Sequence, residues 1–173
     1  MTQPNHFQRL GLPGRFVVDA SALERAYLER SRLVHPDFHA HATPEARSAS
    51  LGASAALNEA YTTLKDPYRR AEYLLGVHLG DSPQLTLTLP ASFLMEAMEL
   101  RERIEAATQS RGQEIISAVE DEIVERIGSE QAAVARLFDS DLPIEALLQI
   151  REHLNVWKTL TSLRRSIGDA TTW

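Results

Sequence analysis

The chain of 173 residues contains no cysteine, so it has no disulfide, no thiol nucleophile and no cysteine-held zinc or iron–sulfur centre. No apolar run approaches the roughly 20 residues that a membrane-spanning helix needs. The start of the chain, MTQPNHFQRL, lacks the apolar segment behind a basic tip that marks a secretory signal. A glycine-rich phosphate loop is also missing from the sequence, so we expect the chain not to hydrolyse ATP itself.

Basic residues are too few for a general nucleic-acid binder, because the net charge is -6 at pH 7. The charge is also uneven along the chain. Residues 1–79 hold nine Lys and Arg against eight Asp and Glu, whereas residues 80–173 hold nine against 16. This difference predicts two surfaces that bind different partners.

A segment rich in glycine, proline and serine separates these two halves. Residues 76–92, GVHLGDSPQLTLTLPAS, show no helical spacing of apolar residues. The alternating Leu and Thr at 85–89 imitate a strand, but one short strand is not stable alone, so we expect an extended linker. The sequence therefore predicts a domain at 1–76, a linker at 77–91 and a second domain at 92–173.

Capping residues predict three helices in the first domain. Asp19 is an expected N-cap, Thr43-Pro44 places proline at the first helical position, and Asp66-Pro67 repeats that signal. His35-Pro36 ends the first helix, because proline disfavours helical backbone in the residue before it. The predicted helices run from Asp19 to about Val34, from Thr43 to Lys65 and from Asp66 to a stop at Gly76.

Three longer amphipathic helices are predicted in the second domain. Apolar residues recur at helical spacing over about 93–109, 113–137 and 143–167. Ser92 is the expected N-cap of the first, Gly112 separates the first two, and Asp141 with Pro143 opens the third. Short connections between such helices favour an antiparallel three-helix bundle, so the whole chain is predicted to be all-α.

A His-Pro-Asp tripeptide lies at the connection between the first two predicted helices. Pro36 restricts the backbone, so His35 and Asp37 are held side by side in a stiff loop before any partner binds. The sequence offers no nucleophile, metal set or second acid to accompany them, which disfavours an enzyme that uses the pair as acid and base. A docking loop fits better, although proline and aspartate also meet by chance in ordinary turns.

Two arginines share one face of the helix before this loop. Arg25 and Arg32 are seven residues apart, which places them two helical turns apart on the same side. A basic face that ends in a rigid loop is suited to docking on an acidic surface, where the Asp37 carboxylate can bind an arginine. The histidines of the loop are held in no ligand geometry, so we predict no metal site and no cofactor.

The first domain resembles the J-domain family, the co-chaperones of DnaK-type heat-shock ATPases. The likeness is carried by residues 6–12 (HFQRLGL), by the His-Pro-Asp loop and by residues 58–70. It implies an antiparallel helical hairpin with short flanking helices. The chain departs from many relatives by having Phe38, not lysine, after the loop. The resemblance also implies that the loop stimulates ATP hydrolysis by the partner and that the basic face steers docking, which concerns His35, Pro36, Asp37, Arg25 and Arg32.

The helix predicted at 93–109 has more apolar residues than one buried stripe requires. At about 100° per residue, the stripe lies within about 40° of Phe93 and comprises Ala97, Leu100, Ile104 and Ala107. A second apolar cluster lies at about 100–200°, has acidic neighbours, and comprises Leu94, Met98 and Met95, with Glu99 and Glu102. This cluster either packs against the rest of the chain or forms an exposed interaction surface, to which the adaptable shape of methionine is suited.

The same segment, FLMEAMELRE, is similar to the client-binding helix of the HscB family, the J-domain co-chaperones of iron–sulfur cluster assembly. Tyr73-Leu74-Leu75 is similar to that family too. There the client is the scaffold protein IscU and the ATPase is HscA. The resemblance implies that this chain delivers an IscU-like scaffold to an HscA-like ATPase. It also implies that the scaffold contacts Leu94, Met95, Met98, Glu99 and Glu102, with Val156 and Trp157 on the last helix as further candidates.

The resemblance further implies a non-catalytic, cytoplasmic adaptor. The chain has no cysteine and so lacks the N-terminal cysteine zinc module of some eukaryotic relatives, which favours a bacterial protein. We expect a monomer that binds neither nucleic acid nor membrane. Two alternatives stay open: a J-domain protein with a different client, and one whose second domain serves dimerisation.

Overall fold

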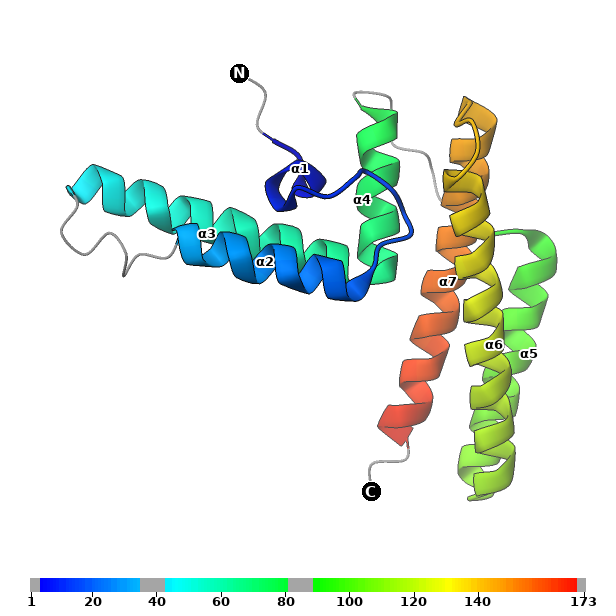
Figure 1. The fold of residues 1–173 in the computed structure, drawn as a ribbon. Helices are drawn as coiled ribbons and strands as arrows, with labels where there is room; N and C mark the ends of the chain where they lie inside the picture. Colours follow the sequence, from blue (N-terminus) through cyan, green and yellow to red (C-terminus); the bar gives the residue numbers. More distant parts are fainter. Residues whose placement is uncertain (1–3, 35–42, 81–88, 171–173) are drawn as a thin grey trace. The chain divides into compact units, whose positions relative to one another are not determined.

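The structure is a computed structural model that describes residues 4–34, 43–80 and 89–170. These residues form seven α-helices and no strand, which confirms the all-α prediction (Figure 1). The chain divides into two compact units, residues 1–76 and 77–173. No helix in the described ranges combines the length and the apolar character that crossing a membrane requires.

The first unit is built on a hairpin of two helices, α2 (Ala20–Val34) and α3 (Pro44–Lys65). Both begin at the predicted caps. The Asp19 carboxylate accepts hydrogen bonds from the N–H groups of Ser21 and Ala22 at 2.8 and 3.0 Å. The Thr43 hydroxyl accepts one from the Ala46 N–H at 3.3 Å. These bonds satisfy N–H groups that the first turn of a helix leaves without a partner, which explains why the capping residues located both starts correctly.

Contacts between α2 and α3 show that the hairpin is antiparallel, as the J-domain resemblance implied. In the middle of α2, the Tyr27 hydroxyl donates to the Asn58 side-chain carbonyl at 2.9 Å, and the Tyr27 ring stacks on Tyr61 at 4.2 Å between centroids. At the end of α2, the Ser50 hydroxyl donates to the Val34 carbonyl at 2.7 Å. A residue later in α2 thus contacts a residue earlier in α3, so the two helices run in opposite directions.

Two short helices, α1 (His6–Leu10) and α4 (Pro67–Leu79), flank the hairpin. The Tyr73 hydroxyl accepts a hydrogen bond from the His6 backbone N–H at 2.8 Å, and the two rings stack at 4.1 Å between centroids. Gly76 does not end α4, contrary to the prediction, because it lies within the helix. The left-handed residue that follows the helix is Gly80, with φ 55°.

Gly11 ends α1 in the left-handed conformation, with φ 66°. A Cβ atom at this position would also overlap the guanidinium of Arg30. We therefore expect Gly11→Ala to lower the free energy of unfolding of the first unit by about 1–2 kcal/mol, the usual cost of left-handed backbone for a residue with a side chain. Urea denaturation followed by circular dichroism measures this change.

Gly14→Ala is the matched control, because a Cβ atom at Gly14 meets nothing within 4 Å. This control is expected to stay within about 0.5 kcal/mol of the unchanged chain, as surface substitutions generally do. Equal stability of the two alanine variants would contradict the role assigned to Gly11.

The second unit contains α5 (Ala91–Gln109), α6 (Gln113–Phe138) and α7 (Ile144–Ala170), joined by short connections. One apolar cluster from all three helices forms a core, which is the bundle that amphipathic spacing predicted. Helix α5 starts after Pro90, and Ser92 is not its cap. The predicted linker at 77–91 therefore loses residues at both ends to α4 and α5. Residues 81–88 within it, with most of the Leu-Thr alternation, lie outside the described ranges.

Candidate functional site

The predicted docking loop, His35-Pro36-Asp37, lies outside the described residues, but its two anchor points are described. Helix α2 ends at Val34, whose carbonyl is bound by the buried hydroxyl of Ser50 on α3. Helix α3 begins after Thr43, whose side chain caps it. Both points where the segment leaves and re-enters the fold are therefore fixed by the hairpin itself.

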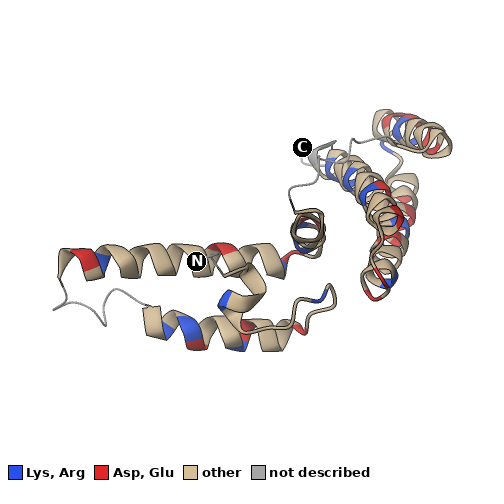
Figure 2. Cartoon of the chain, turned by 90° about the horizontal axis from the view of Figure 1, so that it is seen from above, with Lys and Arg blue, Asp and Glu red and all other residues tan. Residues whose placement is uncertain are grey.

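Arg25 and Arg32 both lie exposed on α2. Leu28 lies between them on the same face and is 48% exposed. Charged residues of both signs occur along α2, whereas α3 carries none between Arg47 and Glu59 (Figure 2). The sequence reasoning missed Leu28, although a leucine off the stripe that buries Leu23 was a usable signal. The candidate ATPase-docking face thus carries two cations and an apolar side chain, together with the exposed carboxylate of Glu29.

Arg30 belongs to a different face of α2. Its guanidinium lies beside Gly11, at the end of α1. Together with Arg9 and Leu33 it lines a small pocket of about 170 Å³. The positive charge of α2 is therefore divided between two faces, and Arg30 is not part of the one that carries Arg25 and Arg32.

The second apolar cluster of α5 is exposed. Leu94, Met95 and Met98 are 47%, 67% and 65% exposed, and Glu99 and Glu102 beside them are exposed as well. The helical wheel also assigned the core stripe correctly, because its members are buried or packed against the core: Phe93, Ala97, Leu100, Ile104 and Ala107. We name the five exposed residues the α5 surface. Within this unit, Leu94, Met95 and Met98 stand outside the core cluster.

Val156 and Trp157, the further client-contact candidates, lie on α7 and are not exposed like the residues of the α5 surface. Each is only 5% exposed, and Val156 belongs to the core cluster with Leu160 and Leu163. A run from Leu154 to Trp157 is buried without a break. Val156 therefore contributes to the core of this unit, whereas Trp157 is buried without belonging to that cluster, and their assignment as client contacts stays a prediction.

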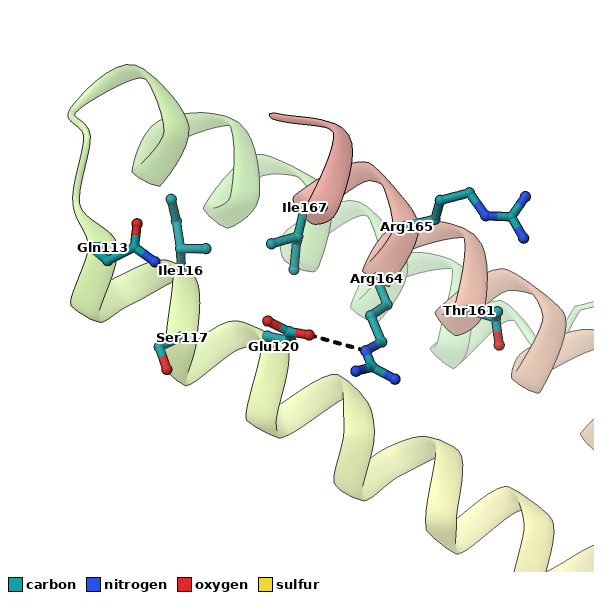
Figure 3. Close-up of a pocket in the computed structure, with 9 residues that line it drawn as sticks. Gln113, Ile116, Ser117, Glu120, Thr161, Arg164, Arg165 and Ile167 are labelled. Carbon is teal, nitrogen blue, oxygen red and sulfur yellow. Dashed lines mark hydrogen bonds and ion pairs between the residues drawn. The ribbon is translucent and has the colours of Figure 1, made fainter. Parts of the chain in front are cut away.

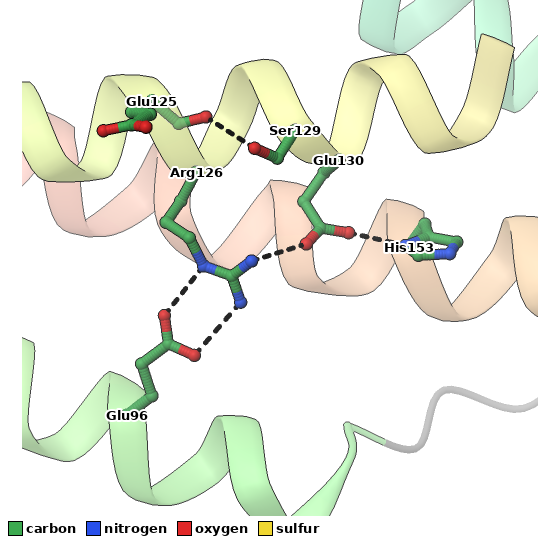
Figure 4. Close-up of polar contacts among 6 residues, drawn as sticks. All are labelled: Glu96, Glu125, Arg126, Ser129, Glu130 and His153. Atoms are coloured by element: carbon green, nitrogen blue, oxygen red, sulfur yellow. Dashed lines mark hydrogen bonds and ion pairs between the residues drawn. The ribbon is translucent and has the colours of Figure 1, made fainter. Parts of the chain in front are cut away.

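A chain of polar side chains that the sequence reasoning missed joins all three helices of the second unit (Figure 4). Arg126 on α6 donates to both carboxylate oxygens of Glu96 on α5, at 2.9 and 3.1 Å. It also lies 3.5 Å from Glu130, which is 2.6 Å from His153 on α7. The usable signal was Glu130 itself, seven residues after Ile123 and therefore on the apolar stripe of α6.

A pocket of about 410 Å³ lies between α6 and α7 (Figure 3). Arg164 Nε donates across it to Glu120 at 3.1 Å, while Arg165 points away from that pair. The charges of Arg164 and Glu120 therefore neutralise each other within the pocket. Among the residues that the structure describes, no three His, Asp or Glu side chains gather closely enough to hold a metal ion.

Comparisons with known proteins agree with this arrangement. A family model described as the HSCB C-terminal oligomerisation domain matches residues 89–167. A co-chaperone protein HscB homolog from Vibrio atlanticus (strain LGP32) is 36% identical over 151 residues, which cover 86% of this chain and 88% of that protein.

Two solved structures share the fold. The chaperone HscB from Vibrio cholerae matches with a TM-score of 0.77 and 28% identity over 96% of each chain. The human co-chaperone protein HscB matches with a TM-score of 0.85 over 98% of this chain and 83% of that one, and at 24% identity it shows the fold alone. These structures place a J-domain before a helical domain, in the order of the two units here. The identity to the Vibrio atlanticus protein over nearly the full length of both sequences shows that the chain belongs to the HscB family of co-chaperones.

Proposed function

We propose that the chain binds an IscU-like iron–sulfur scaffold protein, delivers it to an HscA-like ATPase of the DnaK type, and stimulates ATP hydrolysis by that partner. The J-domain contributes the docking face and the His-Pro-Asp loop, and the bundle holds the client. The proposal places the protein in the cytoplasm, acting as a monomer without catalytic activity of its own.

The observation that carries the proposal is the exposed α5 surface. Three large apolar side chains, each about half to two thirds exposed, stand together on one side of a helix that already has a complete core stripe. Single exposed apolar side chains are common on soluble proteins, but a contiguous group of them marks an interaction site. The carboxylates of Glu99 and Glu102 favour a client that presents basic side chains around an apolar centre.

Two binding functions on one chain make the delivery efficient. A client held on the bundle is carried to the ATPase whenever the J-domain docks, so its local concentration at the ATPase rises far above that in solution. This effect requires no new contact between client and ATPase. It does require that the α5 surface and the docking face of α2 be occupied at the same time.

The proposal is tested by measuring ATP hydrolysis by the HscA-like partner with the scaffold, with this chain, and with both. Together they should stimulate the ATPase strongly, and the scaffold concentration needed should fall by about tenfold or more when the chain is present. An unrelated DnaK substrate protein serves as the control client and should gain nothing. If the scaffold requirement is the same with and without the chain, the delivery role is wrong.

Self-association is the second candidate role of the bundle, because the family model that matches it is described as an oligomerisation domain. Sedimentation velocity of the full chain over a range of concentrations separates the two roles. A monomer that shifts to a larger species only when the scaffold is added supports client binding. A concentration-dependent dimer that loses the scaffold as it forms supports the alternative.

A further inference from the structure

The first turns of α5 carry Leu94, Met95 and Met98 of the α5 surface, but few interactions stabilise the start of this helix. The helix starts after Pro90 with no side-chain hydrogen bond at its cap, and its first turn holds no acidic residue. Such a start lacks both usual sources of stabilisation for a helix N-terminus. Phe93 provides most of the core packing of this part of α5. Ala97, one turn later, is small and only partly buried, so it adds little.

Glu96 lies in this segment and makes the hydrogen bonds that attach it to α6. It is bound through both carboxylate oxygens by the planar guanidinium of Arg126, a geometry that fixes direction as well as distance. The Glu96 hydrogen bond raises the pKa of Arg126, so the guanidinium stays charged. Because Arg126 belongs to α6, the bond joins the client helix directly to the bundle.

A second carboxylate, Glu130 on α6, contacts the side of the Arg126 guanidinium that faces away from Glu96. Glu130, one turn further along α6, is 6% exposed and lies 3.5 Å from the Arg126 guanidinium. A carboxylate buried this far needs partners for its charge, and it has two: Arg126 and His153 on α7, at 2.6 Å. Figure 4 shows Arg126 between the two carboxylates, with Glu130 turned toward His153. Residues of both α6 and α7 therefore position the Arg126 guanidinium that binds Glu96.

We infer that Arg126 is a positioning residue for the client: through Glu96 it sets the rotation of the first half of α5, and so the direction in which Leu94, Met95 and Met98 face. Arg126 stands on another helix and acts through Glu96. This inference rests on the proposed client-binding function. It adds that client affinity depends on a residue outside the client surface.

The chain contains a matched control for the ion pair between Arg126 and Glu96. Arg103 on α5 bonds Glu122 on α6 at 2.8 Å, so it joins the same two helices seven residues later. Its side chains are 47% and 45% exposed, only slightly more than those of Arg126 and Glu96 at 40% and 35%. The two ion pairs therefore differ mainly in geometry, because Arg126 binds both carboxylate oxygens of Glu96 and also contacts the buried Glu130.

Arg103 lies beyond the turns that carry Leu94 and Met95. Arg103→Met thus removes an α5–α6 ion pair away from the start of α5. It also removes a cation one turn after Glu99, a change that favours a basic client, so the control cannot imitate the weaker binding expected of Arg126→Met.

The test compares Arg126→Met with Arg103→Met by titrating the full chain with an IscU-like scaffold, with folded protein quantified by circular dichroism. Arg126→Met should raise the Kd by about fivefold, within the range found for residues that act through a contact network. Arg103→Met should change it by less than about twofold. Glu96→Gln is the milder second variant, because it leaves Arg126, Glu130 and His153 in place, and it should weaken binding as well.

A double-mutant cycle separates positioning from a general structural role. In a chain that already carries alanine at Leu94, Met95 and Met98, Arg126→Met should have no further effect on the Kd, because the side chains it directs are gone. Equal losses in both backgrounds would overturn the inference, and so would unchanged binding by both Arg126→Met and Glu96→Gln. If the alanine chain itself binds the scaffold normally, the proposed client surface fails instead, which keeps the two failures distinct.

Discussion

Replacing His35 by glutamine is expected to reduce ATP hydrolysis by the HscA-like partner to its basal rate, while the fold and client binding are retained. Glutamine is polar and of similar length, but it lacks the imidazole ring that the proline-stiffened loop presents. The substitution lies between two helix ends that are held independently, at Val34 by Ser50 and at Thr43 by its own cap. Because both helix ends are anchored by described residues, we expect stability to be unchanged.

The measurement is single-turnover ATP hydrolysis by the partner at saturating concentrations of the chain, since saturation separates stimulation from docking. His39→Gln is the matched control, because it makes the same chemical change four residues later in the same segment. It should stimulate as the unchanged chain does. Full stimulation by His35→Gln, or an equal loss in both variants, would contradict the role of the tripeptide.

The hairpin could be predicted closely because its boundaries are set by local chemistry. Asp19 and Thr43 bind N–H groups two or three residues away, so the sequence near each cap already contains both partners of the bond. Gly76 failed as a stop for the opposite reason. A glycine permits a left-handed turn but does not require one, and α4 continues through Gly76 to Leu79 before Gly80 takes that conformation.

The α5 surface could also be predicted, because a helical wheel places residues on faces without knowing what covers them. The same reasoning could not settle Val156 and Trp157. Four neighbouring residues of α7, Leu154 to Trp157, are buried together, so burial there is not limited to one stripe. The contact between Glu130 and His153 could not be predicted either. His153 belongs to another helix, and its distance of 2.6 Å from Glu130 depends on how α6 and α7 pack.

Replacing Leu94, Met95 and Met98 together by alanine is expected to weaken client binding by at least about 2 kcal/mol, or about 30-fold in Kd. Full burial of a leucine or methionine side chain stabilises a complex by about 1.5–3 kcal/mol. These three are 47–67% exposed, so roughly half of that remains to be gained from each when a client covers it. The three contacts are neighbours and not strictly additive, which is why 2 kcal/mol is taken as a lower bound. Calorimetric titration with the scaffold measures the change.

A second triple variant shows whether the effect belongs to this surface or to exposed apolar area in general. Ile115, Ile144 and Leu148 are 53%, 49% and 48% exposed and lie on α6 and α7 of the same unit. Their replacement by alanine removes a comparable exposed area away from α5, so it should leave the Kd within about twofold. Because the α5 side chains lie outside the core cluster, their removal should not lower the unfolding temperature by more than a few degrees. Normal scaffold binding by the Leu94, Met95 and Met98 variant would show that the client binds elsewhere, whereas a large loss of stability with unchanged binding per folded molecule would show that these residues belong to the core.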